Sequence, residues 1–180
     1  MSIHSFAVRN IMMACLLTSS AALAGWEKTG AAEATFYAKG PVGFKIVGKT
    51  PSVKIHDDGT QLTFTVRLDA IDTGNGLRNR HMREDLVADT YPLVTLQVPL
   101  ASLKVPGAAA STEKAQGTFG IHGQTKVIPF SYTASCKNKV CSVEGSAQVN
   151  LKDYGVKIRS YLGITVKPDI RISAKFQIKQ

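Results

Sequence analysis

Hydrophobic and polar residues alternate one by one along most of the chain beyond residue 25. The clearest run lies between residues 61 and 69, where Leu62, Phe64, Val66 and Leu68 are separated by polar residues. Because successive side chains of a strand point to opposite faces, this period of two predicts a strand with one buried face and one wet face. The same alternation recurs in residues 36–46, 53–55, 94–100, 119–121, 128–132, 143–151 and 170–178.

Sequences typical of turns separate these runs. Residues 57–59 (Asp-Asp-Gly) favour a hairpin, and residues 123–124 (Gly-Gln) divide two further runs. Residues 106–107 (Pro-Gly) open a stretch of small residues that we expect to form a loop through Ala115. About eight strands at hairpin spacing predict an all-β protein, either an antiparallel barrel or a sandwich.

One segment, residues 75–88, breaks the alternation. Charged residues occupy positions 78, 80, 83, 84 and 85, and Asn75 is a residue type that favours the start of a helix. Met82 and Leu86 are four positions apart, so they share one face of a helix. We expect one short helix, from Gly76 to about Val87, near an end of the barrel.

Residues 1–24 have the features of a secretory signal peptide. Arg9 precedes an uncharged apolar run, and residues 22–24 (Ala-Leu-Ala) fit the small-x-small cleavage pattern. The run is shorter than the roughly 20 apolar residues needed to span a bilayer. A lipoprotein site at Cys15 is a weaker alternative, because Cys15 lies inside the apolar run. We therefore expect export to the periplasm, or secretion, and a single domain over residues 25–180.

The charge balance is strongly basic, with a formal net charge of +9. A basic surface suits nucleic acid, anionic lipid or simple solubility. Here the basic residues are spread along the expected strands at polar positions, which is typical of a solvated barrel exterior. We expect no nucleic-acid partner, and transient attraction to an anionic membrane surface is the second interpretation. The residues concerned are Lys45, Lys54, Arg67, Lys126, Arg171 and Lys175.

Two cysteines follow the expected cleavage site. Cys136 and Cys141 flank the turn-like residues 137–139 (Lys-Asn-Lys), so they can close a hairpin as a disulfide in an oxidising compartment. The alternatives are a metal clip or a redox pair. A lone C-x4-C lacks the second ligand pair of a structural zinc site and is not a C-x-x-C motif. We expect a structural disulfide and no metal.

Candidate catalytic residues are sparse. His81 is the histidine most open to a catalytic interpretation, but no H-x-x-H or H-E-x-x-H spacing occurs. The acidic residues Asp72, Glu84 and Asp85 form no persuasive acid pair, and no nucleophile elbow is present. We expect no catalytic residue and no cofactor. An alternative role for Arg78 and His81, three apart on one helical face, is contact with a polar ligand head at the barrel mouth.

Several short motifs stand out together: residues 72–74 (Asp-Thr-Gly), 77–83 (Leu-Arg-Asn-Arg-His-Met-Arg) and 91–92 (Tyr-Pro), followed by residues 121–126 and 150–154. The first three resemble the central signature of the YceI-like family, and the last two are similar to its later elements. Asn79 departs from the aspartate that is usual there, and the cysteine pair is not a general family feature. The resemblance implies a lipocalin-like antiparallel barrel, active outside the cytoplasm, that binds a polyisoprenoid chain such as that of a quinone, without catalysis or metal.

The expected ligand site combines the lipid-binding barrel that the resemblance implies with the inward positions that the period of two predicts. The inward set is apolar, and the helix contributes residues near one end. The alternative is a barrel filled by its own phenylalanines, which would suit a partner-binding or regulatory protein without a ligand. No oligomeric state is predicted. The expected ligand-binding residues are Phe36, Phe44, Phe64, Val66, Leu68, His81, Leu86, Val94, Leu96, Phe119, Ile121, Phe130, Tyr132 and Phe176.

Overall fold

The computed structural model describes residues 25–40, 43–158, 160–161 and 164–180. The expected signal peptide, residues 1–24, lies outside the described residues. In the described part, no helix has both the length and the hydrophobicity needed to cross a membrane.

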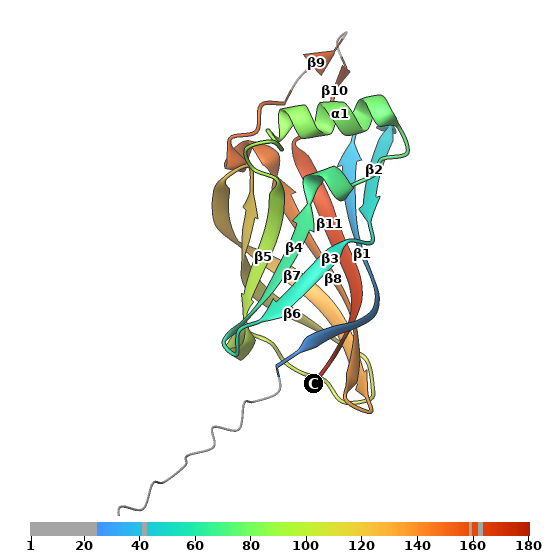
Figure 1. Ribbon diagram of the computed structural model, residues 1–180, viewed down its shortest axis with the longest axis vertical. Coiled ribbons are helices and arrows are strands. Elements are labelled where there is room, and N and C mark those ends of the chain that lie inside the picture. Colours follow the sequence, from blue (N-terminus) through green and yellow to red (C-terminus); the bar gives the residue numbers. More distant parts are fainter. Residues whose placement is uncertain (1–24, 41–42, 159, 162–163) are drawn as a thin grey trace, which may run out of the picture.

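Nine strands form one antiparallel sheet that rolls into a barrel (Figure 1). Their order in the sheet is β2-β1-β11-β8-β7-β6-β5-β4-β3. A separate two-stranded sheet joins β9 (Ser160–Tyr161) and β10 (Ile164–Thr165). The barrel strands are β1 (Glu27–Lys39), β2 (Lys45–Thr50), β3 (Val53–Asp57), β4 (Gln61–Arg67), β5 (Leu93–Pro99), β6 (Ser111–Ile121), β7 (Gln124–Lys137), β8 (Val140–Asn150) and β11 (Asp169–Lys179).

The barrel closes through the chain itself, between β2 and β3. The two strands are consecutive and are interrupted only at Pro51 and Ser52. Pro51 has no N–H to donate to a ladder, and the N–H of Ser52 instead donates to Oγ1 of buried Thr50 at 3.0 Å. Because β2 pairs with β1 and β3 pairs with β4, the two halves join the ends of the sheet. The predicted count of about eight strands is one short because the single predicted run over residues 36–46 is divided between β1 and β2.

One loop prediction was wrong. Residues 111–115 were expected to continue the loop of small residues, but they form the start of β6. The register pairs Ser111 with Ala134 and Ala115 with Phe130, both on the long strand β7. Hydrogen bonding to that neighbour outweighs the weak strand preference of the small residues.

The helix α1 (Gly76–Asp85) lies across one end of the barrel, which we call the helix end (Figure 1). Its N-cap is Asn75, whose side-chain oxygen accepts a hydrogen bond from the N–H of Arg78 at 3.0 Å. The helix ends about two residues earlier than expected, and Val87 adopts a left-handed backbone with φ 49°. Leu86, the C-cap residue, is buried, and Met82 packs against the core.

Three short 3-10 helices extend from strand ends: η2 (Leu68–Ala70), η3 (Leu100–Ser102) and η4 (Leu151–Tyr154). Two of them, η2 and η4, follow the ends of β4 and β8 at the helix end and direct large apolar side chains inward. With residues beside them these side chains form what we call the plug, a packed layer that fills the barrel under α1. The plug consists of Leu68, Ile71, Leu86, Ile121, Tyr154 and Val156, all buried.

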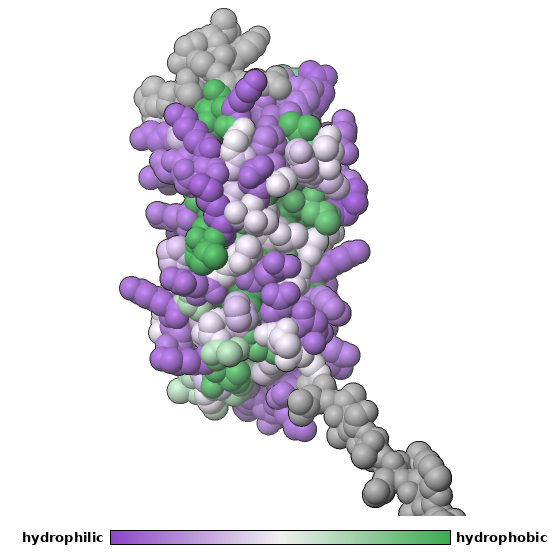
Figure 2. Space-filling model, turned by 90° about the vertical axis from the view of Figure 1, so that its left-hand side faces the viewer, coloured by the Kyte–Doolittle hydropathy of each residue, from purple (hydrophilic) through white to green (hydrophobic). Residues whose placement is uncertain are grey.

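The exterior of the barrel is largely polar (Figure 2). The basic residues of the strands form scattered ion pairs there, such as Lys175 with Glu144 at 3.2 Å and Lys49 with Glu33 at 3.6 Å. Pairs this exposed contribute little to stability. These charged side chains face solvent on the outer surface of the barrel, and the apolar side chains of each strand face the lumen.

Candidate ligand-binding cavity

The barrel encloses an apolar cavity of about 280 Å³. The barrel is therefore hollow rather than completely filled by its phenylalanines. Nine of the residues expected to bind a ligand line this cavity, all of them from strands. They are Phe36, Phe64, Val66, Val94, Leu96, Phe119, Phe130, Tyr132 and Phe176.

A row of small residues makes room for the cavity. Ala34 on β1 pairs with Ala174 on β11, which pairs with Gly145 on β8, and all three line the cavity. Gly145 pairs in turn with Tyr132 on β7. The alternation places these small residues at inward positions, where a larger side chain would fill the lumen. The expected site omitted them because it was built from large side chains, although Ala and Gly at inward positions are the signal for space.

Two phenylalanines meet across the lumen. Phe64 on β4 and Phe176 on β11 have ring centroids 5.0 Å apart at a tilted angle of 49°. Their strands are not neighbours in the sheet, so this contact crosses the cavity rather than running along one wall. The pair therefore narrows the lumen and presents aromatic faces to whatever occupies it.

The cavity extends to the end of the barrel opposite α1, where residues 100–107 form what we call the strap. The cavity is lined here by four strap residues, Leu100, Leu103, Val105 and Pro106. Trp26, directly before β1, also lines it. Val105 is 62% exposed, so the lining reaches solvent here. We call this the mouth end. The predicted alternating run ends at Leu100, which is why the strap was missed.

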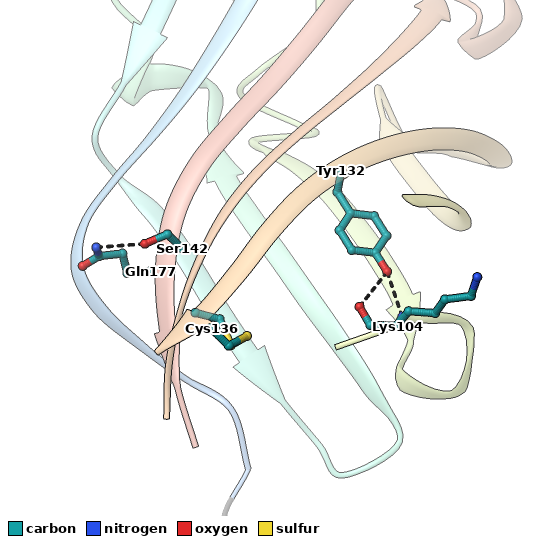
Figure 3. The surroundings of a disulfide bond; sticks show 6 residues. Lys104, Tyr132, Cys136, Ser142 and Gln177 are labelled. Carbon is teal, nitrogen blue, oxygen red and sulfur yellow. Dashed lines mark hydrogen bonds between the residues drawn. A yellow bond between two sulfur atoms is a disulfide. The ribbon is translucent and has the colours of Figure 1, made fainter. Parts of the chain in front are cut away.

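The strap is fastened to the barrel at two points, and Figure 3 shows the first, where Tyr132 meets Lys104. The Tyr132 hydroxyl accepts a hydrogen bond from the N–H of Lys104 at 2.8 Å and donates one to the Lys104 carbonyl oxygen at 3.1 Å. The N–H of Cys136 donates to the carbonyl oxygen of Gly107 at 2.9 Å. One phenol thus satisfies both backbone groups of a strap residue.

The predicted disulfide is confirmed. Cys136 and Cys141 are bonded and lie opposite each other at the end of β7 and β8. Both line the cavity at the mouth end. The bond therefore holds the hairpin to which the strap is attached.

Replacing Tyr132 with phenylalanine is expected to loosen the strap. The change keeps the ring but leaves the N–H and carbonyl of Lys104 without their partner, at a cost of about 1–2 kcal/mol. Amide hydrogen exchange of residues 100–107 should accelerate, and dissociation of a bound apolar ligand should become faster. Tyr37→Phe, on the outer face of β1, is the matched control. Unchanged exchange in the strap of Tyr132→Phe would show that the phenol does not hold it.

Three expected ligand-binding residues belong to the plug and do not line the cavity. Leu68, Leu86 and Ile121 are 1%, 8% and 3% exposed, and they pack in the core. They were assigned to the site because alternation separates inward from outward residues but does not show where along the lumen packing is solid. The structure corrects these assignments: they are residues of the closed end.

Two others are corrected because they lie outside the barrel interior. His81 is exposed on α1, so it is separated from the cavity by the plug. Phe44 is 55% exposed, because β2 begins only at Lys45 and Phe44 belongs to the preceding turn. Its ring lies under the guanidinium of Arg78, 5.6 Å from the ring centroid. Arg78 and His81, the alternative contacts for a polar ligand head, lie at the helix end and do not line the cavity.

The signature residues near α1 fasten the helix to the barrel. The Asn79 side-chain oxygen accepts hydrogen bonds from the N–H and the hydroxyl of Thr73, at 2.8 and 2.6 Å. Its amide donates to Asp72 at 2.8 Å, and the N–H of Gly74 donates to the same carboxylate oxygen at 2.9 Å. These bonds, the Asn79 amide first, lower the pKa of Asp72. Asp72 is also joined to Lys49 of β2 by two backbone hydrogen bonds of 2.8 Å.

The later signature residues close the same end. Tyr91 lies against Gly123, where a β-carbon would come within 2.5 Å of its ring, and Gly123 has a φ of +72°. Nδ1 of His122 is 2.9 Å from the carbonyl oxygen of Tyr154. The ring of Tyr154 packs edge-on against Phe119, with ring centroids 5.6 Å apart. Burial raises the pKa of the Tyr154 phenol. The motifs that carry the resemblance therefore build the closed end rather than contact a ligand.

No set of three or more metal-ligating side chains is grouped within the described residues. The cavity lining includes one charged residue, Lys104, at the mouth. Such a site binds by apolar contact and shape, with a polar group available only where the cavity reaches solvent.

Comparison with known proteins agrees with this geometry. The model of the YceI-like domain matches residues 29–178. No curated protein matches the chain in sequence. Among solved structures, a polyisoprenoid binding domain from Saccharophagus degradans, implicated in plant cell wall breakdown, has 13% identity and a TM-score of 0.71, covering 86% of this chain and 98% of that one.

Two further structures share the fold. Burkholderia cenocepacia BcnA has 16% identity and a TM-score of 0.65, covering 81% of this chain and 95% of its own. A Campylobacter jejuni YCEI protein has 15% identity and a TM-score of 0.54, covering 100% and 91%. At these identities the likeness concerns the fold.

Proposed function

The chain belongs to the YceI-like domain family, and from that premise we propose that it is an exported carrier of a polyisoprenoid, quinone-like or similar apolar lipid chain. The observation that carries the proposal is the apolar cavity, open at the mouth end and closed by the plug. The polyisoprenoid binding domain with the same fold supports the choice of ligand class. The role is binding rather than catalysis, because the lining of the cavity offers no acid–base pair or activated nucleophile.

The closed helix end determines how a ligand would lie. A chain entering from the mouth has the plug ahead of it, so its tail would reach inward past Phe64 and Phe176 while its head stays near the strap. Lys104 and the phenol of Tyr132 are the polar side chains nearest that head. The protein therefore suits an amphiphile with one polar end.

Apolar contact alone is enough for useful affinity. An isoprenoid chain that loses about 500 Å² of exposed surface gains on the order of 12 kcal/mol. Association costs about 4–15 kcal/mol. At the lower end of that cost, the difference is close to the roughly 8 kcal/mol of a micromolar complex.

Export is part of the proposal. Two observations support it: the signal-like residues 1–24 and the Cys136–Cys141 disulfide, which persists in an oxidising compartment. The periplasm is the proposed location, with secretion as the alternative. A regulatory protein with a filled barrel is disfavoured by the cavity.

The test is identification of a co-purifying molecule. The full chain, produced with residues 1–24 in a bacterial host, is examined by native mass spectrometry before and after organic extraction. An added mass that disappears on extraction, and an isoprenoid or other apolar chain in the extract, are expected. The delipidated protein is then titrated with farnesol, a short isoprenoid alcohol, using emission of Trp26, the single tryptophan of the chain. A protein that is empty on isolation and does not respond to farnesol would refute the carrier function.

A further inference from the structure

We propose that the mouth end docks on an anionic membrane surface, so that the cavity exchanges its ligand directly with the bilayer. This inference rests on the proposed function, because it concerns how an apolar ligand reaches the cavity. The contact surface, which we call the rim, consists of Trp26, Leu103, Lys104, Val105, Lys137 and Lys139.

The rim exposes apolar side chains where the cavity opens. Val105 is 62% exposed and also lines the cavity, so it belongs both to the surface and to the lumen. Leu103 lies beside it in the strap, and Trp26 lines the cavity at the start of β1. Hydrophobic surface is visible at this lower end of the barrel in Figure 2. Tryptophan is favoured where one side of a ring meets lipid and the other meets water.

Lysines surround this apolar surface on the side of the strap and the β7–β8 turn. The Lys104 side chain is 78% exposed, and Lys137 and Lys139 are exposed in the turn. The turn is tied to the strap through the hydrogen bond from Cys136 to Gly107. Near an anionic bilayer each such lysine adds electrostatic attraction to the surface.

The acids of the mouth end are engaged locally. Glu113 forms an ion pair with Lys104 at 3.1 Å. Asp57 accepts hydrogen bonds from the N–H groups of Trp26 and Gly59, at 2.7 and 2.8 Å. Asp58 accepts from both the N–H and the hydroxyl of Thr60. Asp57 ends β3 and Asp58 follows it in the β3–β4 turn, beside Trp26 rather than beside the β7–β8 turn (Figure 1), so the lysine side of the rim can face the lipid.

The cost of exposing an apolar ligand to water favours membrane docking by the mouth end over docking by the helix end. The helix end also exposes apolar side chains, among them Leu77 at 55%. The plug, however, closes that end, so a ligand arriving there would have to leave the bilayer and pass through water to the mouth. Each methylene that is exposed to water on the way adds to the free-energy cost of transfer. Docking by the rim keeps the chain out of water throughout.

The experiment compares single substitutions at the two ends of the barrel. The full chain is sedimented with vesicles of phosphatidylcholine alone or with one-fifth phosphatidylglycerol, at low and high salt. Val105→Asp should weaken binding to the anionic vesicles by about tenfold or more, since it removes the burial of a valine and adds a like charge. Val127→Asp, at a valine 66% exposed on the barrel wall, and Leu77→Asp on α1 are the controls and should bind like the unaltered protein. Lys137→Glu should weaken binding and reduce its salt dependence.

Contact by the rim has its own signature. Lipids brominated on their acyl chains should quench Trp26 emission in the unaltered protein and not in Val105→Asp. No binding to anionic vesicles, equal binding by Val105→Asp, or loss of binding in Leu77→Asp would each overturn the proposal. Farnesol titration without vesicles separates this outcome from failure of the carrier function, because Lys137→Glu, at a rim residue outside the cavity lining, should still respond to farnesol.

Discussion

An arginine in place of Phe64 is expected to abolish retention of the apolar ligand. Phe64 lines the cavity and meets Phe176 across it, so the guanidinium would lie in the lumen with no acid among the lining residues to pair with. A charge without a partner in such surroundings costs several kcal/mol, which corresponds to a loss of affinity of about a hundredfold or more. Farnesol titration and native mass spectrometry measure the effect.

The matched control is Thr63→Arg, which places the same group on the outer face of the same strand and should leave binding unchanged. Ala174→Phe serves as a second variant, because it fills the lumen without adding charge. It enlarges a residue whose paired neighbours are Ala34 and Gly145, so it should also block the ligand. The melting temperature should be no lower than that of the unaltered protein. Retention by folded Phe64→Arg and folded Ala174→Phe would place the ligand outside the cavity.

Truncation of Leu68 to alanine should produce the largest loss of stability. Leu68 is 1% exposed, and its N–H donates to the carbonyl of Pro92 at 2.9 Å, which fixes η2 within the plug. The cavity left by a buried leucine costs about 3–5 kcal/mol, and the melting temperature of a domain this size should fall by roughly 6–20 °C. Thermal unfolding followed by circular dichroism measures the shift.

Leu77→Ala is the control for this prediction. Leu77 is 55% exposed on α1, so its truncation should change stability by no more than about 0.5 kcal/mol. Equal melting temperatures for the two variants would mean that the layer beneath α1 is not tightly packed. The helix end would then be a second candidate entrance, and the orientation proposed for the ligand would lose its basis.

The alternation in the sequence was enough to predict an antiparallel barrel or sandwich, and the resemblance to the YceI-like family narrowed the choice to a barrel. A period of two follows from backbone geometry alone, so Leu62, Phe64 and Val66 could be placed on one face without any knowledge of their neighbours. Asn75 likewise caps α1 for a local reason. The start of β6 at Ser111 was not predictable in this way, because its strand structure depends on pairing with β7.

The candidate site could be predicted only in part. The strand phase identified inward residues such as Phe130 and Phe176, but which end of the lumen is filled depends on segments distant in sequence. Leu68 and Ile121 share the inward phase with Phe64 and still lie in solid packing. The strap was not predicted because it is held by hydrogen bonds to Tyr132 and Cys136, which belong to a strand far along the chain.

The interruption at Pro51 and Ser52 bears on the size of ligand that the protein can take. Elsewhere the circumference of the barrel is a series of hydrogen-bonded ladders, whose spacing resists stretching. At this corner the two sides are joined by covalent links of the chain rather than by a ladder. The barrel can widen at this corner by bending of the chain, without loss of inter-strand hydrogen bonds. We therefore expect its diameter to adjust to ligands thicker than the cavity described above.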